Sequence, residues 1–157
     1  MPADPLTWQR DGFEVTTDPA RLDLDAIHAF LSGVSYWAAG IPRATLERAI
    51  AGSLPFGLLE GSRQVGFARV ITDWATFVYL ADVYVLEELR GRGLGRFLMD
   101  CIVGHPDLQG FRRWALVTRD AHALYRAYGF RPVARPERWM EITNPDPYRK
   151  APAENAE

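Results

Sequence analysis

A loop rich in glycine and arginine, residues 90–95 (RGRGLG), lies where a strand-forming run ends and a helical pattern begins. Glycine lets backbone amides approach a ligand without a Cβ in the way, and a helix start adds free N–H groups and the positive end of the helix dipole. The residues that would form this cradle or supply its charge are Arg90, Gly91, Arg92, Gly93, Leu94, Gly95 and Arg96. The loop therefore predicts a phosphate site, and a pyrophosphate with a third phosphate nearby, as in coenzyme A, matches its arginines.

Two other kinds of phosphate-binding loop do not fit these letters. A P-loop needs a lysine and then a hydroxyl residue after its glycines, and neither follows here. A dinucleotide-binding loop needs the spacing GxGxxG, but Arg96 stands where the third glycine would fall. A turn that merely joins a strand to a helix stays open as the alternative for the loop taken alone.

The elements that must position this loop follow from hydrophobic periodicity. Strands are expected over residues 13–17, 56–60, 64–73, 76–86, 114–118, 130–134 and 139–143. Helices are expected between Leu24 and Gly33, between Pro42 and Gly52, between Leu94 and Gly104, and over residues 121–128, with Asp120 as the cap of the last. Antiparallel hairpins in the middle of this order exclude a purely parallel, doubly wound sheet.

Bulk properties exclude several classes of protein. A chain of 157 residues has room for one domain, expected at residues 1–143, followed by a Pro-rich polar tail at residues 144–157. The formal net charge of −2 gives no overall basic field for nucleic acid or an anionic membrane. No leader or membrane-spanning run is evident, so a cytoplasmic location is expected. One cysteine, Cys101, and three scattered histidines do not resemble a ligand set, so no metal site is expected.

Two motifs together resemble the GNAT superfamily of acyl-CoA N-acyltransferases. The family's phosphate loop has the pattern [QR]xxGx[GA], matched by Arg90, Gly93 and Gly95, and its last helix reads roughly ALYxxxGF, matched by residues 123–130. The order of elements agrees from residue 13 to residue 143, and a small bacterial subgroup without named substrates looks most alike. The resemblance implies a mixed α/β (α+β) fold with a central, mostly antiparallel mixed sheet flanked by helices.

The resemblance also implies a coenzyme site for acetyl-CoA. Its arm would lie along the strand before the loop, bonded to the backbone of Val83, Tyr84 and Val85. Many members carry an asparagine where this chain has Thr118, which puts that coenzyme contact in doubt. Asp120 and His122 are candidates to replace it.

Catalytic and acceptor-binding residues follow from the same resemblance. Tyr125 matches the tyrosine that serves as general acid in many members, and Asp82, which interrupts an apolar strand, is a candidate base unless strand alternation places it on a solvated face. The candidate walls of the acceptor pocket are Tyr36, Trp37, Trp74 and Tyr79, with Tyr84.

The function implied is transfer of an acetyl group from acetyl-CoA to a primary amine of a small molecule or a peptide. Two alternatives stay open: a module that binds coenzyme A without catalysis, as a sensor or in a complex, and an interaction domain with no coenzyme. A homodimer is also left open, and the sequence does not identify the amine.

Overall fold

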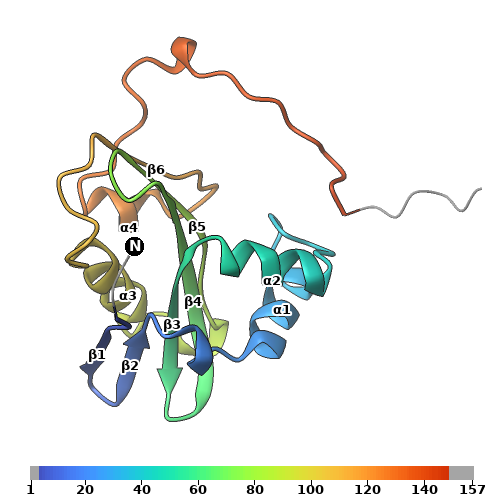
Figure 1. Ribbon diagram of the computed structural model, residues 1–157, viewed down its shortest axis with the longest axis vertical. Coiled ribbons are helices and arrows are strands. Elements are labelled where there is room, and N and C mark those ends of the chain that lie inside the picture. The colour runs from blue at the N-terminus through green and yellow to red at the C-terminus, as the bar shows by residue number, and fades with distance from the viewer. Residues whose placement is uncertain (1–3, 149–157) are drawn as a thin grey trace, which may run out of the picture.

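A single six-stranded sheet forms the centre of the protein, seen in a computed structural model that describes residues 4–148 (Figure 1). The strands follow one another across the sheet in chain order, antiparallel except for the parallel pair β5–β6. They are β1 (Thr7–Arg10), β2 (Phe13–Thr16), β3 (Leu54–Glu60), β4 (Arg63–Thr72), β5 (Phe77–Val85) and β6 (Arg113–Ala115). The parallel pair needs a crossover, and α3 supplies it. Within residues 4–148, no helix is long and apolar enough to cross a membrane.

Helices cover both faces of the sheet. Figure 1 shows α1 (Leu24–Gly33) and α2 (Arg43–Ala51) on one face, and α3 (Leu94–Val103) and α4 (His122–Arg126) on the other. Each layer has its own apolar core, so that Ile27, Leu31 and Leu46 pack on one side while Leu98 and Ile102 pack on the other. This is the mixed, mostly antiparallel sheet flanked by helices that the sequence predicts.

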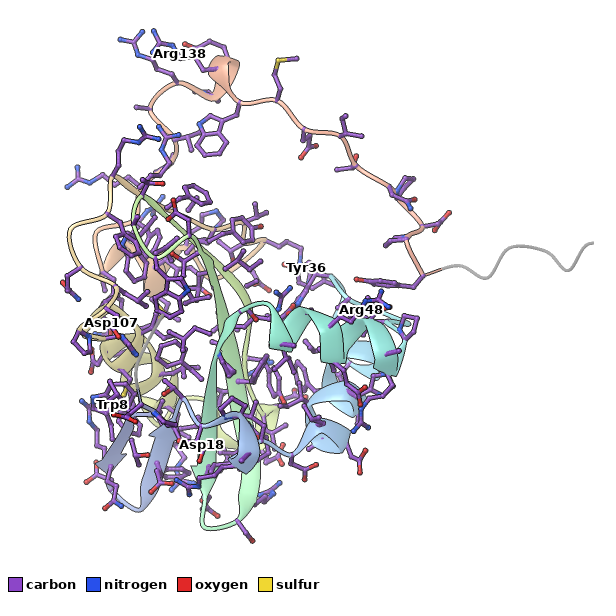
Figure 2. All side chains as sticks on the ribbon, viewed as in Figure 1. Trp8, Asp18, Tyr36, Arg48, Asp107 and Arg138 are labelled. Atoms are coloured by element: carbon purple, nitrogen blue, oxygen red, sulfur yellow. The ribbon has the colours of Figure 1, made fainter. Side chains whose placement is uncertain are left out.

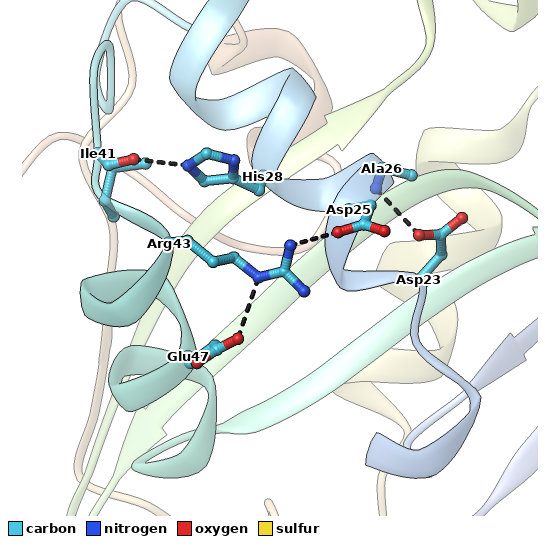
Figure 3. Close-up of polar contacts among 7 residues, drawn as sticks. All are labelled: Asp23, Asp25, Ala26, His28, Ile41, Arg43 and Glu47. Atoms are coloured by element: carbon cyan, nitrogen blue, oxygen red, sulfur yellow. Dashed lines mark hydrogen bonds and ion pairs between the residues drawn. The ribbon is translucent and has the colours of Figure 1, made fainter.

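Polar contacts fix the first two helices to one another. Asp23 caps α1 by accepting a hydrogen bond from the Ala26 N–H (Figure 3). The Arg43 guanidinium joins the two helices, because it contacts Asp25 on α1 as well as Glu47 one turn along α2. These contacts hold the start of α2, where the connection that carries Tyr36 and Trp37 ends, against the start of α1.

A β-bulge in β5 changes which side chains face which layer. Arg69 of β4 lies opposite Ala81, whereas Phe67 lies opposite Tyr84, so one extra residue is inserted in β5. The bulge is at Asp82, whose φ of 55° is in the left-handed region. Val78 and Leu80 belong to the core beneath α3, but beyond the bulge the Tyr84 ring enters the core of α1 and α2.

The structure corrects the prediction at both ends of the chain. The expected strands over residues 130–134 and 139–143 are absent, and that part of the chain is exposed and leaves the sheet. Apolar alternation indicates a strand, but a strand also needs a neighbour, and this segment has none in the described chain. The strand expected over residues 114–118 is shorter, and β1 was not predicted. Asp120 does not cap α4, since the Ala121 N–H donates to the Thr118 hydroxyl instead. Of the expected tail, residues 149–157 lie outside the described residues.

Candidate active site

The two parallel strands, β5 and β6, lie at one side of the sheet and separate partway along β5. Pairing between β5 and β6 covers only three positions and ends with Tyr79 opposite Ala115. From Leu80 to the end of β5, the strand has no partner on that side within residues 4–148, although β4 still pairs with its other side. Val83, Tyr84 and Val85 lie on this free stretch. The backbone groups on the side of this stretch that faces away from β4 have no strand partner in the described chain, although the Val85 carbonyl accepts a hydrogen bond from Arg90 Nε.

The glycine loop, residues 90–95, follows β5 after the 3-10 turn Glu87–Leu89 and turns the chain into α3. Gly91 and Gly93 have φ of 77° and 79°, a region that strains other residues, and a Cβ added at either position would meet open space. Gly93 is the N-cap of α3, and the first bond of the helix runs from the Phe97 N–H to the Gly93 carbonyl. The N–H groups of Leu94, Gly95 and Arg96 therefore have no acceptor in the helix and no acidic side chain in its first turn. Three backbone donors are thus left without an acceptor at the place where the sequence predicts a phosphate site.

The three arginines of the loop lie in different places. Arg90 folds back, so that its Nε donates to the Val85 carbonyl oxygen at 3.3 Å. The Arg92 guanidinium lies 5.4 Å from the centre of the Phe13 ring. Arg96 follows the loop in the first turn of α3, where its carbonyl accepts a hydrogen bond from the Tyr128 hydroxyl at 2.9 Å. The positive charge is thus spread around the loop, with Arg90 on the β5 side.

Tyr125 combines burial with an unengaged hydroxyl. The residue is 7% exposed, and its ring packs edge-on against Phe130 at 5.9 Å. No hydrogen bond joins its hydroxyl to any other described residue. Burial raises the pKa of Tyr125 to about 12, and the neighbouring Tyr36 and Asp120 add to the shift. At neutral pH the hydroxyl is therefore a protonated donor without an acceptor in the described chain.

The turn between β6 and α4 places the next two candidates. Thr118 uses its hydroxyl to accept from the Ala121 N–H at 3.0 Å, which leaves its own proton to donate. Asp120 is largely exposed and makes a long ion pair with Arg119 at 3.8 Å. The two side chains therefore have different partners, Ala121 for Thr118 and Arg119 for Asp120.

A network of side chains joins this turn to the connection between α1 and α2 and, through it, to Asp82 on β5. The Tyr36 hydroxyl accepts from the Arg119 N–H at 3.3 Å, and the Arg119 guanidinium lies 3.8 Å from the centre of the Tyr36 ring. Tyr36 packs edge-on against Trp37 at 5.1 Å, and the Trp37 indole N–H donates to Asp82 Oδ1 at 2.9 Å. The connection between α1 and α2 is thereby tied to both parallel strands.

Asp82 is the end point of this network. Its second oxygen accepts from Arg69 Nε at 2.5 Å, and the two side chains are 9% and 17% exposed. The bulge that sets its φ also turns the carboxylate to the side of α1 and α2. Asp82 is therefore a largely buried, paired carboxylate, not one on a solvated face. The residues of this aromatic–carboxylate network are Tyr36, Trp37, Arg69, Asp82 and Arg119.

The other predicted wall residues lie apart from the network. Trp74 is in the turn between β4 and β5, with φ of 64°, and packs on the core beneath α3. Tyr79 is opposite Ile71 on β4 and Ala115 on β6. Tyr84 is buried and stacks on Phe30, with 3.7 Å between ring centres, and burial raises its pKa well above the usual range. The side chain of Tyr84 is thus a core residue, while its backbone lies on the free stretch of β5.

Two members of the network, Arg69 and Arg119, were not predicted from the sequence. Arg69 lies in a strand whose alternation gives no sign of the bulge opposite it. Arg119 follows a short strand and resembles any surface arginine in the sequence. Only the approach of distant segments makes either residue part of the site.

Comparison with known proteins agrees with this geometry. A family model for the acetyltransferase (GNAT) domain matches residues 53–132. The acetyltransferase candidate FG08082 of Gibberella zeae is 38% identical over 143 residues, which cover 77% of this chain and 80% of that protein. A crystal structure of a protein assigned to the GNAT family, from Xanthomonas campestris pv. campestris, has a TM-score of 0.86 and 50% identity, covering 90% of this chain and 100% of that one.

A more distant structure shows the same fold with the coenzyme in place. A GNAT acetyltransferase from Elizabethkingia anophelis, solved with acetyl-CoA bound, has a TM-score of 0.58 at 13% identity and covers 78% of each chain. At that identity the likeness concerns the fold alone. The family model and the Gibberella relative carry the assignment: the chain belongs to the GNAT acetyltransferase family. It is an acyltransferase, and enzymes of this family use acetyl-CoA.

Proposed function

We propose that the chain transfers the acetyl group of acetyl-CoA directly to a primary amine of a small molecule or a peptide. The observation that carries the proposal is the free edge of β5, which leads through the 3-10 turn Glu87–Leu89 to the glycine loop at the start of α3. Such an edge offers hydrogen bonds to an extended chain, and the helix start offers them to phosphate groups. Together they suit a coenzyme that has both parts.

Each part of the site has a separate task in this proposal. The N–H groups of Leu94, Gly95 and Arg96 hold the pyrophosphate, and the loop arginines supply charge around it. Bound acetyl-CoA supplies a thioester carbonyl that an amine attacks. Backbone N–H groups on the free stretch of β5 donate to the carbonyl oxygen as negative charge develops there.

Asp82 acts on the positive charge of the amine, and Tyr125 acts on the negative charge that develops at the sulfur. An alkyl amine with a pKa near 10.4 must lose a proton before it attacks, at a cost of about 4.6 kcal/mol at pH 7. Asp82 attracts the protonated amine and accepts this proton, with the oxygen lone pairs that Trp37 and Arg69 leave unused. The Tyr125 hydroxyl donates a hydrogen bond to the departing sulfur, which leaves as a thiolate when the C–S bond breaks and takes up the second proton that the amine nitrogen releases. A thiol has a pKa near 8.5, so a tyrosine of pKa about 12 keeps its proton and acts as a donor throughout.

The pocket wall formed by Tyr36 and Trp37 would receive the amine. Both rings are partly exposed and both belong to the network that ends at Asp82. Aromatic faces attract cations, so this wall favours a positively charged amine.

Two measurements on one protein preparation test the proposal. Acetyl-CoA at about 100 times its Kd should stabilise the protein by about 2.7 kcal/mol and raise its Tm by several degrees. A thiol-release assay should then find an amine that accelerates release of coenzyme A, among polyamines, amino acids, aminoglycosides and peptide N-termini. No rise in Tm at millimolar acetyl-CoA would contradict the coenzyme site. A rise in Tm without release for any amine class would contradict transfer.

A further inference from the structure

The layer of α1 and α2 covers only part of the sheet face on which it lies. Phe67 of β4 and Tyr84 of β5 are directly opposite one another, and they are the two described strand residues that are buried in the core of these helices. From this pair, β4 runs on to its turn with β5, and Figure 1 shows that turn above both helices. The stretch of β4 and β5 next to the turn therefore has one face outside the helical layer.

This uncovered part of the face carries apolar side chains. Because side chains alternate along a strand, Ile71 shares the face of Phe67, and so do its partner Tyr79 on β5 and the next partner, Ala115 on β6. Val117, two residues beyond Ala115, continues this alternation. The whole set, called the bare face here, is Ile71, Phe77, Tyr79, Ala81, Ala115 and Val117. None of them belongs to either apolar core, and Ile71 and Val117 are 40% and 83% exposed, which marks a binding surface.

The bare face continues the proposed active site. Ala81, which is opposite Arg69, directly precedes Asp82 in β5. The Asp82 carboxylate is turned to the same face, where it accepts hydrogen bonds from Arg69 and Trp37. Tyr79 comes three residues before Asp82, which is about 10 Å along an extended strand. An acceptor whose amine lies at Asp82 therefore has apolar surface within about 10 Å of its nitrogen.

Two aromatic rings border the space at Asp82 from the helical layer. Tyr36 and Trp37 pack edge-on and are 48% and 42% exposed. Figure 2 shows Tyr36 at the upper edge of the layer of α1 and α2, on the side of the turn between β4 and β5. The hydrogen bond from the Trp37 indole N–H to Asp82 fixes the two rings beside the carboxylate. The acceptor thus meets aromatic rings on one side and the bare face on another.

Charge indicates what occupies the bare face. Its six residues are all uncharged, and the carboxylate that follows them in β5 is Asp82. A ligand that matches this order has one positive charge at one end and an apolar body at the other, because a second ammonium group on the bare face would leave water without a counter-charge. A flat ring suits a sheet face that presents the ring of Tyr79. We propose, on the basis of the acetyl transfer proposed above, that the acceptor is an arylalkyl amine whose ring lies on the bare face between Ile71 and Tyr79.

A comparison of three acceptors tests the substrate class. Phenethylamine, ethylamine and putrescine all carry a primary amine, but only the first has a ring and only the last has a second charge. Burial of the ring should give phenethylamine a kcat/KM about 10- to 100-fold above that of ethylamine, and putrescine should be no better than ethylamine. Equal rates for the three amines would overturn this inference and leave acetyl transfer standing. No release of coenzyme A with any amine would overturn both proposals.

A charge placed on the bare face should change the preference. Ile71→Glu should lower kcat/KM for phenethylamine by about 10-fold or more, leave ethylamine unchanged and improve putrescine, because the new carboxylate meets the second ammonium group. Val117→Glu, at the β6 side of the face, should act in the same direction. Val34→Glu is the matched control, since Val34 is also an exposed apolar residue, at 68%, but lies at the end of α1. It should leave the order of the three amines as in the wild type.

Three further measurements make the variants comparable. Circular dichroism should show that each is folded, and the Kd for acetyl-CoA should equal that of the wild type, because the bare face lies apart from the glycine loop. Light scattering coupled to size exclusion gives the mass of each variant. An Ile71→Glu protein that still prefers phenethylamine would overturn the proposal. A dimeric wild type that Ile71→Glu converts to a monomer would assign the bare face to a second copy and overturn it as well.

Discussion

The glycine loop and the aromatic–carboxylate network, the two parts of the proposed site, are built in opposite ways. The loop consists of six consecutive residues. Its polar groups are backbone N–H groups, which positive φ angles and a helix start leave without an acceptor. The network uses side chains from four separate segments, and its polar atoms are matched to one another by hydrogen bonds and an ion pair. The loop therefore suits a ligand common to a whole family, whereas the network suits the partner that differs between members.

The comparison predicts that the largest loss of activity comes from the network. Asp82→Asn removes the proton acceptor and should lower kcat/KM by about 10²- to 10⁴-fold at pH 7. It leaves Arg69 without its counter-charge, so the free energy of unfolding should also fall. Asp25→Asn is the matched control, since it breaks an exposed ion pair with Arg43 (Figure 3) and should leave kcat/KM unchanged. Stopped turnover with intact acetyl-CoA binding would support the role of Asp82, and unchanged turnover would remove it.

Tyr125→Phe tests a hydroxyl that belongs to neither the glycine loop nor the network. The loss of its hydroxyl should lower kcat by about 10- to 100-fold and leave the Kd for acetyl-CoA nearly unchanged. Because the pKa of Tyr125 is about 12, no step assigned to its ionisation should occur in the pH–rate profile below pH 10. Tyr128→Phe serves as the comparison, because the single proton of that hydroxyl is shared between Asp100 Oδ1 at 2.6 Å and the Arg96 carbonyl oxygen at 2.9 Å. It should lower Tm while turnover persists.

A smaller effect is expected from strain in the loop. Gly93→Ala places a Cβ at φ of 79°, which costs about 1–2 kcal/mol and should raise the Kd for acetyl-CoA by about 10-fold as the loop relaxes. Gly61→Ala is the control, with φ of 60° and open space around its Cβ in the turn between β3 and β4. Both variants should lose similar stability, measured by urea unfolding. If both lowered affinity equally, the loop would have no special part in binding.

The smallest expected effect concerns stability alone and lies outside both regions. Asp73 accepts hydrogen bonds from the Thr76 hydroxyl and from the N–H groups of Thr76 and Ala75, and these hold its pKa far below the usual range. A depressed carboxyl pKa stabilises the fold above the unfolded value near 3.9, and this contribution is lost as the pH falls toward the folded value. Asp73→Ala should therefore lower Tm at pH 7 and flatten its decline between pH 5 and pH 3. An unchanged acid branch would contradict this, and acetyl transfer at pH 7 should stay at the wild-type rate.

The sequence predicted the parts of the fold whose signals are local. The stop at Gly52, the Gly61-Ser62 turn and the apolar face of α3 all appear where expected. The missed strand β1 also had a local signal, since Asp11-Gly12 is the kind of pair that closes a tight hairpin, and both residues have positive φ. The wrong strands at residues 130–134 and 139–143 failed for another reason. Their residue types favour a strand, but the sequence does not specify which strand would pair with them.

The candidate site divides in the same way. The glycine loop was predicted because it depends on residues close together in the chain, and the backbone of Val83, Tyr84 and Val85 and the side chain of Tyr125 were predicted through the resemblance to the family. The pairing of Asp82 with Arg69 and Trp37 was not, because it depends on a single extra residue in β5 that turns one carboxylate to the other face.

Sequence alone determined the conformation of the glycine loop, since backbone conformation at glycines and at a helix start is set by the nearest residues. Only the tertiary structure decided where strands β5 and β6 separate and which charges meet across the layers. Those depend on contacts between residues far apart in the chain, which no local preference can encode.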